Sequence, residues 1–356
     1  MKLLILNRYG RKGASSRLRS LQYLPWFAQA GIDYETHPLF SDELLTRRYE
    51  LGRYPRPSVL AAYSARVRQL MRRHEFDLLW IEKEALPWMP ASVERALLRG
   101  VPYVLDYDDA IFHQYDQHRS PWVRTALGRR IDALMRGARL VVCGNGYLAD
   151  RARRAGAAQV VVVPTVIDLE RYAVAERRTD DDGRPRIVWI GSPSTATYLA
   201  GLQAPLADLS RHHDFELRVI GVPDFTLPSV RVHATDWTEA TEVDSLRACD
   251  IGIMPLADGP WERGKCGYKL VQYMACGLPV VGSPVGVNSD IIRAGENGFL
   301  ARSDVDWTGA LSALIESAEL RRQFGAVGRR RVEEEYCVQR AAPKLISLLR
   351  QVTATR

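Results

Sequence analysis

Short apolar segments recur along the chain, and each is followed by a turn or helix-capping sequence and then by helical sequence. Five of them are KLLILN at 2–7, DLLWIE at 77–82, VPYVLD at 101–106, RIVWIG at 186–191 and DIGIM at 250–254. Apolar strands that alternate with helices are typical of a parallel sheet covered on both faces. Because the same order begins again at residue 186, the sequence predicts an α/β protein with two Rossmann-like domains.

The domain boundary is expected near the middle of the chain, because 356 residues are long for one hydrophobic core. Residues 173–185 (AVAERRTDDDGRP) are polar and charged and end in Gly-Arg-Pro, which indicates a linker. We therefore expect an N-terminal domain at 1–172 and a C-terminal domain at 186–335. Residues 336–356 are expected to form a helix that packs back toward the N-terminal domain.

Composition excludes several classes of protein. Hydrophobic residues make up 46% of the chain, which is typical of a globular protein rather than a disordered one. No apolar run approaches the roughly 18 residues that would span a bilayer, and the apolar start is too short for a signal peptide. The five cysteines are scattered without metal-type spacing, which indicates a reducing cytoplasm.

Positive charge is concentrated in the first half of the chain. Residues 1–170 contain 26 Lys and Arg against 18 Asp and Glu, whereas residues 171–356 contain 23 against 24. Basic helices, with aromatic and aliphatic residues among the arginines, are expected at 47–73 and 120–139. The pattern predicts contact with an anionic membrane surface or a lipid-linked phosphate, and nucleic acid is not the expected partner. A solvated helical face, or an arginine-rich composition, would give the same pattern without a partner.

A glycine turn follows the first strand, in RYGRKGASSRLRS at 8–20. Gly10 and Gly13 lie in the turn, and a serine caps the helix that comes next. This order suits a phosphate at the helix start, and Arg17 could point into a cleft or stand on the surface. The dinucleotide fingerprint G-x-G-x-x-G is absent, which argues against a nicotinamide-dependent oxidoreductase.

Three carboxylates stand at the end of the strand VPYVLD, in DYDDAIFH. Ligands of open parallel sheets bind beyond the carboxyl ends of the strands, so Asp106, Asp108 and Asp109 are placed for chemistry. Such close acids must be paired, metal-bound or partly protonated, and Arg119 and Arg124 are the candidates to neutralise them. An acceptor-binding or general-base role is favoured over a metal site.

In the second half, the strand RIVWIG opens into SPSTAT, whose hydroxyls could hold a phosphate or simply cap a helix. Asp236 and Trp237 end a later strand, where an aromatic ring could stack on a nucleobase or pack in the core. The stretch 261–288, WERGKCGYKLVQYMACGLPVVGSPVGVN, predicts a helix from Tyr268 to Cys276. Lys265 and Lys269 flank the start of that helix, where they would add positive charge for a phosphate.

The run GKCGYKLVQYMACGLPVVGSPVG, followed by NGFL, resembles the donor-binding region of glycosyltransferase family 4, whose members have the two-domain GT-B fold. The resemblance covers most of the chain, because GASSRLR, VPYVLDYDD, VVPTVID, WIGSPST and CDIGIMPL occur in the family's order. It implies a retaining transferase that uses a nucleotide-diphosphate sugar without a metal ion or other cofactor. It also implies two Rossmann-like domains facing a central cleft, with the donor bound by the C-terminal domain.

The motifs and the resemblance together nominate the site residues. The candidates for catalysis are Arg17, Asp108 and Asp109, the last two at the family's His-Asp position. The candidates for binding the nucleotide sugar are Gly13, Ser192, Thr195, Asp236, Trp237, Lys265, Cys266, Gly267, Tyr268, Lys269, Leu270 and Gln272.

The sequence departs from the family at two places. The family's Glu-x(7)-Glu corresponds to Gly264 and Gln272, of which the glutamine can still hydrogen-bond a ribose. The family's basic pair after the first strand of the C-terminal domain is replaced by SPSTAT. We therefore assign neutralisation of the diphosphate to Lys265 and Lys269.

The predicted function is transfer of a hexose-type sugar to a saccharide or lipid-linked saccharide in cell-surface polysaccharide or glycolipid synthesis. The predicted location is the cytoplasm, at the inner face of the plasma membrane. Two alternatives remain, a nucleotide-sugar epimerase or hydrolase with the same fold and a noncatalytic saccharide-binding protein.

Overall fold

The computed structural model describes residues 1–172 and 183–354, and the chain divides into two compact units. The N-terminal unit contains Met1–Thr165, Arg263–Cys266 and Val338–Arg356, and the C-terminal unit contains Val166–Glu262 and Gly267–Cys337. Residues 166–172, which were expected in the first domain, therefore belong to the second unit. Most of the predicted linker, 173–182, lies outside the described residues.

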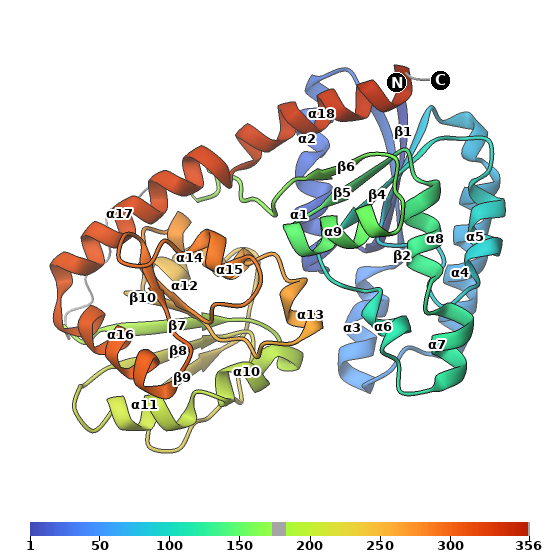
Figure 1. Ribbon diagram of the computed structural model, residues 1–356. Helices are drawn as coiled ribbons and strands as arrows, with labels where there is room; N and C mark the ends of the chain where they lie inside the picture. Colours follow the sequence, from blue (N-terminus) through green and yellow to red (C-terminus); the bar gives the residue numbers. More distant parts are fainter. Residues whose placement is uncertain (173–182, 355–356) are drawn as a thin grey trace. The chain divides into compact units, whose positions relative to one another are not determined.

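The N-terminal unit is built on a six-stranded parallel sheet with the order β2-β1-β3-β4-β5-β6 (Figure 1). Its strands are β1 (Lys2–Tyr9), β2 (Asp33–Phe40), β3 (Leu78–Glu82), β4 (Tyr103–Tyr107), β5 (Leu140–Cys143) and β6 (Val160–Val162). Its helices are α1 (Ala14–Arg19), η1 (Leu21–Tyr23), α2 (Leu24–Gln29), α3 (Asp42–Leu51), α4 (Arg56–Met71), η2 (Arg73–Glu75), α5 (Ala91–Leu98), α6 (His113–Asp116), α7 (Pro121–Leu127), α8 (Arg130–Gly137), α9 (Gly146–Arg154) and α18 (Val338–Ala354).

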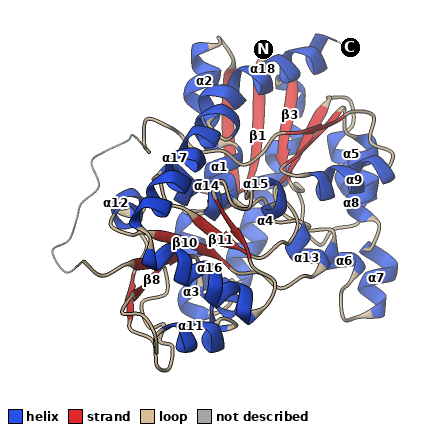
Figure 2. Cartoon of the chain, turned by 60° about the vertical axis from the view of Figure 1, so that its left-hand side comes forward, coloured by secondary structure: helices blue, strands red, loops and turns tan. Residues whose placement is uncertain are grey.

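The C-terminal unit has a second six-stranded parallel sheet with the order β12-β11-β10-β7-β8-β9 (Figure 2). Its strands are β7 (Arg186–Ile190), β8 (Glu216–Ile220), β9 (Val232–Thr235), β10 (Ile251–Met254), β11 (Val280–Gly282) and β12 (Gly298–Leu300). Its helices are η3 (Pro193–Thr195), α10 (Ala196–Ala200), α11 (Gln203–Leu209), α12 (Glu242–Arg247), α13 (Pro260–Arg263), α14 (Tyr268–Ala275), α15 (Asn288–Ile291), α16 (Asp304–Glu316) and α17 (Ala318–Glu335).

The prediction of two Rossmann-like domains is confirmed, and the burial of the strands explains why the sequence showed it. Every residue of β3, β4, β5, β7 and β10 is buried, so these strands appear as unbroken apolar runs rather than as alternating ones. Each strand order reverses direction once. The reversal lies between β1 and β3 in one sheet and between β7 and β10 in the other, where ligands of such sheets bind.

Two predicted helices are interrupted in the structure. The region 47–73 forms α3 and α4, separated at Gly52, which has the left-handed φ of 68° that ends helices, and at Pro55. The region 120–139 forms α7 and α8, separated at Gly128 and Arg129. Within the described part of the chain, no helix is both long and apolar enough to cross a bilayer.

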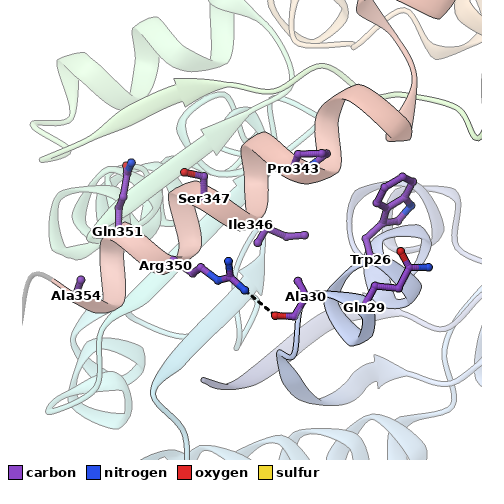
Figure 3. A pocket seen from close by; sticks show the side chains of 9 residues that line it. All are labelled: Trp26, Gln29, Ala30, Pro343, Ile346, Ser347, Arg350, Gln351 and Ala354. Carbon is purple, nitrogen blue, oxygen red and sulfur yellow. Dashed lines mark hydrogen bonds between the residues drawn. The ribbon is translucent and has the colours of Figure 1, made fainter.

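The C-terminal helix α18 completes the N-terminal unit. It packs against α2, and the Arg350 guanidinium donates to the Ala30 carbonyl at 2.6 Å. An open groove of about 610 Å³ runs along this contact (Figure 3) and is lined by Trp26, Gln29, Ala30, Pro343, Ile346, Ser347, Arg350, Gln351 and Ala354. A segment more than 300 residues away in the sequence thus covers the first helices.

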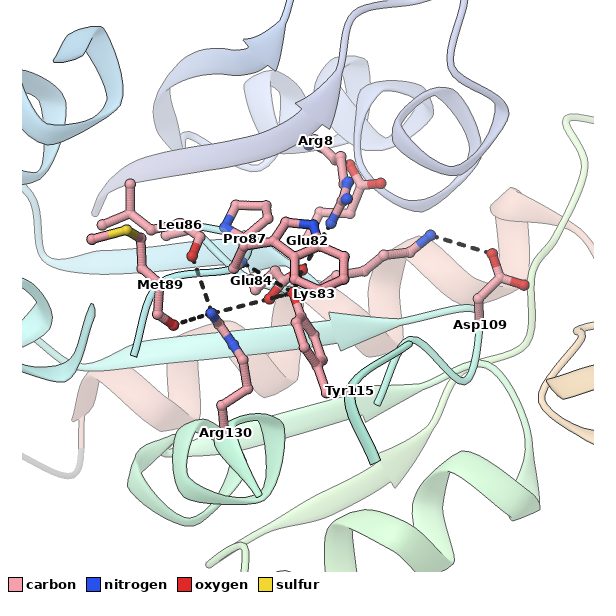
Figure 4. A network of polar contacts seen from close by, with 12 residues as sticks. Arg8, Glu82, Lys83, Glu84, Leu86, Pro87, Met89, Asp109, Tyr115 and Arg130 are labelled. Carbon is pink, nitrogen blue, oxygen red and sulfur yellow. Dashed lines mark hydrogen bonds and ion pairs between the residues drawn. The ribbon is translucent and has the colours of Figure 1, made fainter. Parts of the chain in front are cut away.

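A buried ionic network holds the loop that follows β3 (Figure 4). The Arg130 guanidinium lies 3.0 Å from the Glu84 carboxylate and 2.8 Å from that of Glu94, and all three side chains are at most 1% exposed. Glu84 also accepts hydrogen bonds from Arg8 and Tyr115, both at 2.9 Å. Since every charge has an opposite partner, the loop is fixed without leaving an unpaired ion in the interior.

Replacing Arg130 by methionine is expected to destabilise the protein by about 3–5 kcal/mol, because two buried carboxylates lose their shared cation. Urea unfolding measures the change. The matched control is Arg153→Met, which breaks an ion pair with Asp150 whose side chains are 56% and 60% exposed. That variant is expected to lose at most about 1 kcal/mol, and equal losses in the two variants would contradict the role assigned to the network.

Candidate functional site

Lys83 follows β3 at the point where the strand order of the N-terminal unit reverses. Its backbone has a φ of 64°, a conformation uncommon for a residue with a side chain, and its N–H donates to the Asp106 carbonyl at 2.8 Å. The ammonium lies 2.9 Å from the Asp108 carboxylate and 3.3 Å from that of Asp109. It also donates to the Ser15 hydroxyl at 3.1 Å, so a strained residue joins the ends of β3 and β4 to the glycine turn.

The two aspartates differ in their surroundings. The Asp108 side chain is 12% exposed and that of Asp109 is 29% exposed. Burial favours the neutral form of Asp108, but the Lys83 ammonium, a hydrogen bond from Ser15 and the charge of Arg19 together outweigh it and lower the pKa of Asp108. Burial raises the pKa of Asp109, and the negative charge of Asp108 adds to the rise. Asp109 is thus the more accessible and the more easily protonated of the pair.

Asp106 is neutralised separately, by a buried arginine. Arg19 Nε and Nη2 donate to its two carboxylate oxygens at 2.7 and 3.1 Å, and both side chains are 2% exposed. The cations that pair with the DYDD acids are therefore Arg19 and Lys83, and not Arg119 and Arg124 as predicted. Arg124 instead donates to the carbonyls of His118 and Arg119.

The other predicted residues of the N-terminal turn lie close by. Gly13 precedes α1, and its N–H donates to the Gly10 carbonyl at 3.1 Å. Arg17 in α1 is only 6% exposed, and its Nη1 donates to the Arg11 carbonyl at 3.0 Å. The buried Arg17 side chain therefore supports the glycine turn, which limits how far its guanidinium could reach toward a ligand.

Residues 263–266 belong to the N-terminal unit, where they meet the DYDD loop. The carbonyls of Gly264 and Lys265 accept hydrogen bonds from the Asn145 amide at 3.0 and 2.9 Å. The Cys266 thiol donates to the Asp108 carbonyl at 3.2 Å, and burial raises the pKa of Cys266. The positive charge of Lys265 acts on Asp109, so Lys265 belongs electrostatically to the aspartate site.

Gly264 has no room for a side chain. A Cβ atom there would lie 2.5 Å from the Cβ of Ala110 and 2.8 Å from its backbone nitrogen. A glutamate at this position, which the family pattern carries, would displace the loop after β4. The departure from the pattern therefore has a steric cause in this chain.

In the C-terminal unit, three features gather where β7 ends. The Lys269 ammonium lies 4.3 Å from the centre of the Trp189 ring, a cation–π contact. A Cβ on Gly191 would lie 2.3 Å from the tip of that ring and 2.8 Å from the Thr195 hydroxyl oxygen. Thr195 and Lys269, both predicted to bind the donor, thus surround the glycine that follows β7.

The hydroxyls of the SPSTAT turn bond mainly to the turn itself. The Ser192 N–H donates to Thr195 Oγ1 at 3.1 Å, and this hydroxyl donates back to the Ser192 carbonyl at 3.0 Å. Ser192 Oγ lies 2.9 Å from Ser194 Oγ. The sequence left two possibilities for this turn, a phosphate site and helix capping, and helix capping accounts for these contacts.

Trp237 lies near the same strand ends. Gly221, which follows β8, is packed between them: a Cβ atom on Gly221 would lie 2.1 Å from the Gly191 carbonyl oxygen and 3.5 Å from the Cβ of Trp237. The indole N–H donates to Glu242 at 2.6 Å. Asp236 is exposed. The structure therefore brings the predicted Trp237 near Thr195 but ties its polar edge to the protein.

The predicted helix at 268–276 is confirmed as α14, yet several of its candidate residues face inward. Gly267 precedes it with a φ of 64°, and Tyr268 is half-buried against the core. Leu270 is fully buried, and its N–H donates to the Gly267 carbonyl, so it is a core residue. Gln272 is 3% exposed and donates to the Tyr172 hydroxyl at 2.9 Å.

The bonds of Gln272 continue into a network that the sequence did not reveal. The Tyr172 hydroxyl donates to Glu242 at 2.7 Å, and the same carboxylate pairs with Arg171 at 3.1 Å. Tyr172 and Glu242 are 70 residues apart, and neither belongs to a recognisable motif.

The sequence analysis also missed Lys83 of the N-terminal unit. Lys83 could have been found, because it stands in the charged sequence EKE directly after a buried strand.

Two family models match the chain in succession. The model described as "Glycosyl transferase 4-like domain" matches residues 9–165, and the one described as "Glycosyl transferases group 1" matches residues 184–317.

Curated relatives match over parts of their length. Spore coat protein SA of Bacillus subtilis is 32% identical over 167 residues, covering 45% of this chain and 37% of that protein. D-inositol 3-phosphate glycosyltransferase of Jonesia denitrificans is 26% identical over 206 residues, covering 57% of this chain and 44% of that protein. The match thus spans less than half of each relative.

Solved structures share the fold over the whole chain. Anabaena Alr3699/HepE, in complex with UDP and glucose, has a TM-score of 0.70 at 18% identity and covers 99% of this chain and 100% of that one. Sucrose-phosphate synthase from Thermosynechococcus elongatus has a TM-score of 0.73 at 16% identity, with 100% of both chains covered.

Adding a methyl group at Gly264 is expected to destabilise the protein by about 1–3 kcal/mol, because the Cβ would overlap the loop at Ala110. Urea unfolding of Gly264→Ala measures the loss. Gly309→Ala is the matched control, since Gly309 lies in α16 with no atom within 4 Å of the added Cβ. The control is expected to be neutral or stabilised by up to about 1 kcal/mol, and a Gly264→Ala protein as stable as the native one would show that the loop has room.

Proposed function

Because the chain belongs to the group 1 glycosyltransferases of the family 4 type, with the GT-B fold, we propose that it transfers a sugar from a nucleotide diphosphate to a hydroxyl group of a saccharide or lipid-linked saccharide. The observation that carries the proposal is the match of two successive family models to the sequences of both Rossmann-like units. Synthesis of a cell-surface polysaccharide or glycolipid is the process we infer.

The donor is proposed to bind at the carboxyl end of β7, in the C-terminal unit. Alr3699/HepE has been crystallised with UDP and with UDP-glucose, which supports a nucleotide-sugar donor here. Lys269 is the cation beside Trp189 at this edge, and its charge suits a diphosphate. Trp237 supplies an aromatic side chain near the same strand ends for the nucleotide base.

The reaction we infer retains the configuration of the sugar. The bond between the anomeric carbon and the diphosphate oxygen breaks, and a bond from that carbon to the acceptor oxygen forms on the same face. The acceptor's proton passes to the departing diphosphate oxygen. Such a reaction depends on holding the diphosphate and positioning the acceptor, rather than on a protein nucleophile.

The acceptor is proposed to bind at the DYDD loop of the N-terminal unit. Asp109 is the acid there whose side chain is most exposed, and it can accept a hydrogen bond from a sugar hydroxyl. We propose that no metal ion takes part. Asp106 is paired with Arg19, and Asp108 is paired with Lys83, so the Asp-x-Asp sequence already has its cations.

We further propose that the N-terminal unit contacts the anionic inner face of the plasma membrane. Large apolar side chains stand in water on its basic helices, with Leu60 71% and Trp122 84% exposed. Tyr49 and Leu51, at the end of α3, are 66% and 61% exposed among the arginines of the 47–56 region. Exposed aromatic and aliphatic side chains together with arginines suit a membrane interface.

The membrane proposal predicts that the protein floats with anionic vesicles at low salt and is released at high salt. Leu60→Ser and Trp122→Ser should weaken flotation, because they remove apolar side chains from the proposed face. Val305→Ser is the matched control, since Val305 is 81% exposed in the C-terminal unit between two aspartates. A native protein that does not float even at low salt would refute the contact.

The donor proposal predicts that one of UDP, GDP, dTDP and CDP raises the melting temperature. A ligand at 100 times its Kd adds about 2.7 kcal/mol of stability. Lys269→Met should weaken this binding by at least about tenfold, because a charge-assisted contact with the diphosphate contributes about 1.5–3 kcal/mol. Absence of a shift with all four nucleotides would count against a donor site.

Product analysis with the matching nucleotide sugar, run in excess EDTA, tests the reaction itself. A glycosylated acceptor supports the transferase, whereas free sugar or an isomerised donor would identify a hydrolase or epimerase.

A further inference from the structure

The position and backbone of Lys83 set it apart from the other buried cations of the N-terminal unit. It follows β3 beside β1, at the reversal of strand order where ligands of such sheets bind. A positive φ in a residue with a side chain costs about 1–3 kcal/mol and persists where the surroundings impose it, often at functional sites. Lys83 shares this conformation with Trp88 in the same loop and Ser229 elsewhere among the described non-glycine residues.

The Lys83 ammonium has three oxygen partners. They are Asp108 at 2.9 Å, Asp109 at 3.3 Å and the Ser15 hydroxyl at 3.1 Å. The side chain is 7% exposed. Because the partners come from two separate elements, the ammonium is held in one place, and it fixes the Asp109 oxygen to which it is bonded (Figure 4).

The charges that face Asp109 come from several elements. Lys83 approaches from the loop after β3, Asp108 precedes Asp109 in the chain, and Lys265 approaches from segment 263–266. Asp106 contributes little net charge, since Arg19 neutralises it. The Lys83 ammonium lies within ion-pair distance of Asp109, at 3.3 Å.

A fourth acid, Glu82, lies behind Lys83 and is held by other groups. One of its oxygens accepts hydrogen bonds from the Ser16 hydroxyl at 2.5 Å and the Arg8 N–H at 3.0 Å. Glu82 is 2% exposed, so its carboxylate is enclosed, and its negative charge acts on Lys83. Asp109 is the more accessible acid beside the Lys83 ammonium.

We propose that Lys83 is a positioning residue for the sugar acceptor: it binds one oxygen of Asp109 and leaves the other to accept the hydrogen bond of the acceptor hydroxyl. This inference rests on the proposed function. The lysine does not itself contact the reacting atoms. It orients the carboxylate and opposes the effect of burial on its pKa, because a cation beside an acid stabilises the charged form.

Three variants test the role of Lys83. Lys83→Gln removes the charge and keeps an N–H donor, and Lys83→Asn does the same with a residue that tolerates positive φ. Lys83→Arg keeps the charge. The matched control is Arg8→Gln, which breaks the 2.9 Å ion pair with Glu84 at the end of the neighbouring strand without touching Asp109.

The activity readout is the pH profile of kcat/KM for the acceptor. Loss of the neighbouring cation raises the pKa of Asp109. As the pH is lowered, the variant should therefore lose transfer activity at a higher pH than the native protein does. The acid limb is expected to move up by about 1–3 pH units in Lys83→Gln or Lys83→Asn. It should stay near its native position in Lys83→Arg and Arg8→Gln, and donor binding should be unchanged in all four.

A second readout does not require activity. Carboxyl carbon NMR of protein labelled at aspartate follows the ionisation of Asp109, with Asp109→Asn identifying its resonance. The same upward shift is expected in the two neutral variants. A folded neutral variant in which either the Asp109 titration or the acid limb is unchanged would overturn the proposal.

The two readouts separate this proposal from the proposed function. Native protein that transfers sugar while the neutral variants keep the native pH profile refutes the role of Lys83 alone. Native protein that transfers no sugar from any donor refutes the proposed function, and the role of Lys83 in the reaction falls with it. In that case a shifted Asp109 titration would still show that the ion pair exists as described.

Discussion

Charges removed from water must be matched, and the N-terminal unit depends on this requirement where β3 and β4 end. Arg130 forms ion pairs with Glu84 and Glu94, Arg19 with Asp106, and Lys83 with Asp108 and Asp109. These ion pairs fix the loops that follow the two strands. The accessible Asp109 is therefore held among paired charges, which is what the proposed positioning of an acceptor would require.

The sequence predicted both sheets because their central strands are buried on both faces and so appear as continuous apolar runs. It was less accurate for the helix at 47–73, where the prediction followed arginine-rich helical sequence across Gly52 and Pro55. For the candidate site, the glycine turn, the DYDD acids and Lys269 were found at strand or helix ends. Their partners were not, because Arg19 pairs with Asp106 across 87 residues, a distance that local patterns do not report.

The two departures from the family pattern have different structural settings. Gly264 is pressed against Ala110, so the position excludes any side chain. Gln272 fits its site and joins Tyr172 and Glu242 in a buried hydrogen-bonded chain. Neither position presents a carboxylate to a ligand. Recognition of the donor is therefore proposed to rest on groups at the end of β7, with Lys269 as the cation.

The N-terminal unit is assembled from three separate parts of the chain, the last of which is α18. Domains generally fold as units while the chain is being made. Here the helix that covers α2 leaves the ribosome only after the whole C-terminal unit has been synthesised. The first unit to begin is consequently the last to be completed, and the apolar surface of α2 stays uncovered throughout translation. A fragment ending at Thr165 would lack both segment 263–266 and α18, so it would not contain the whole N-terminal unit.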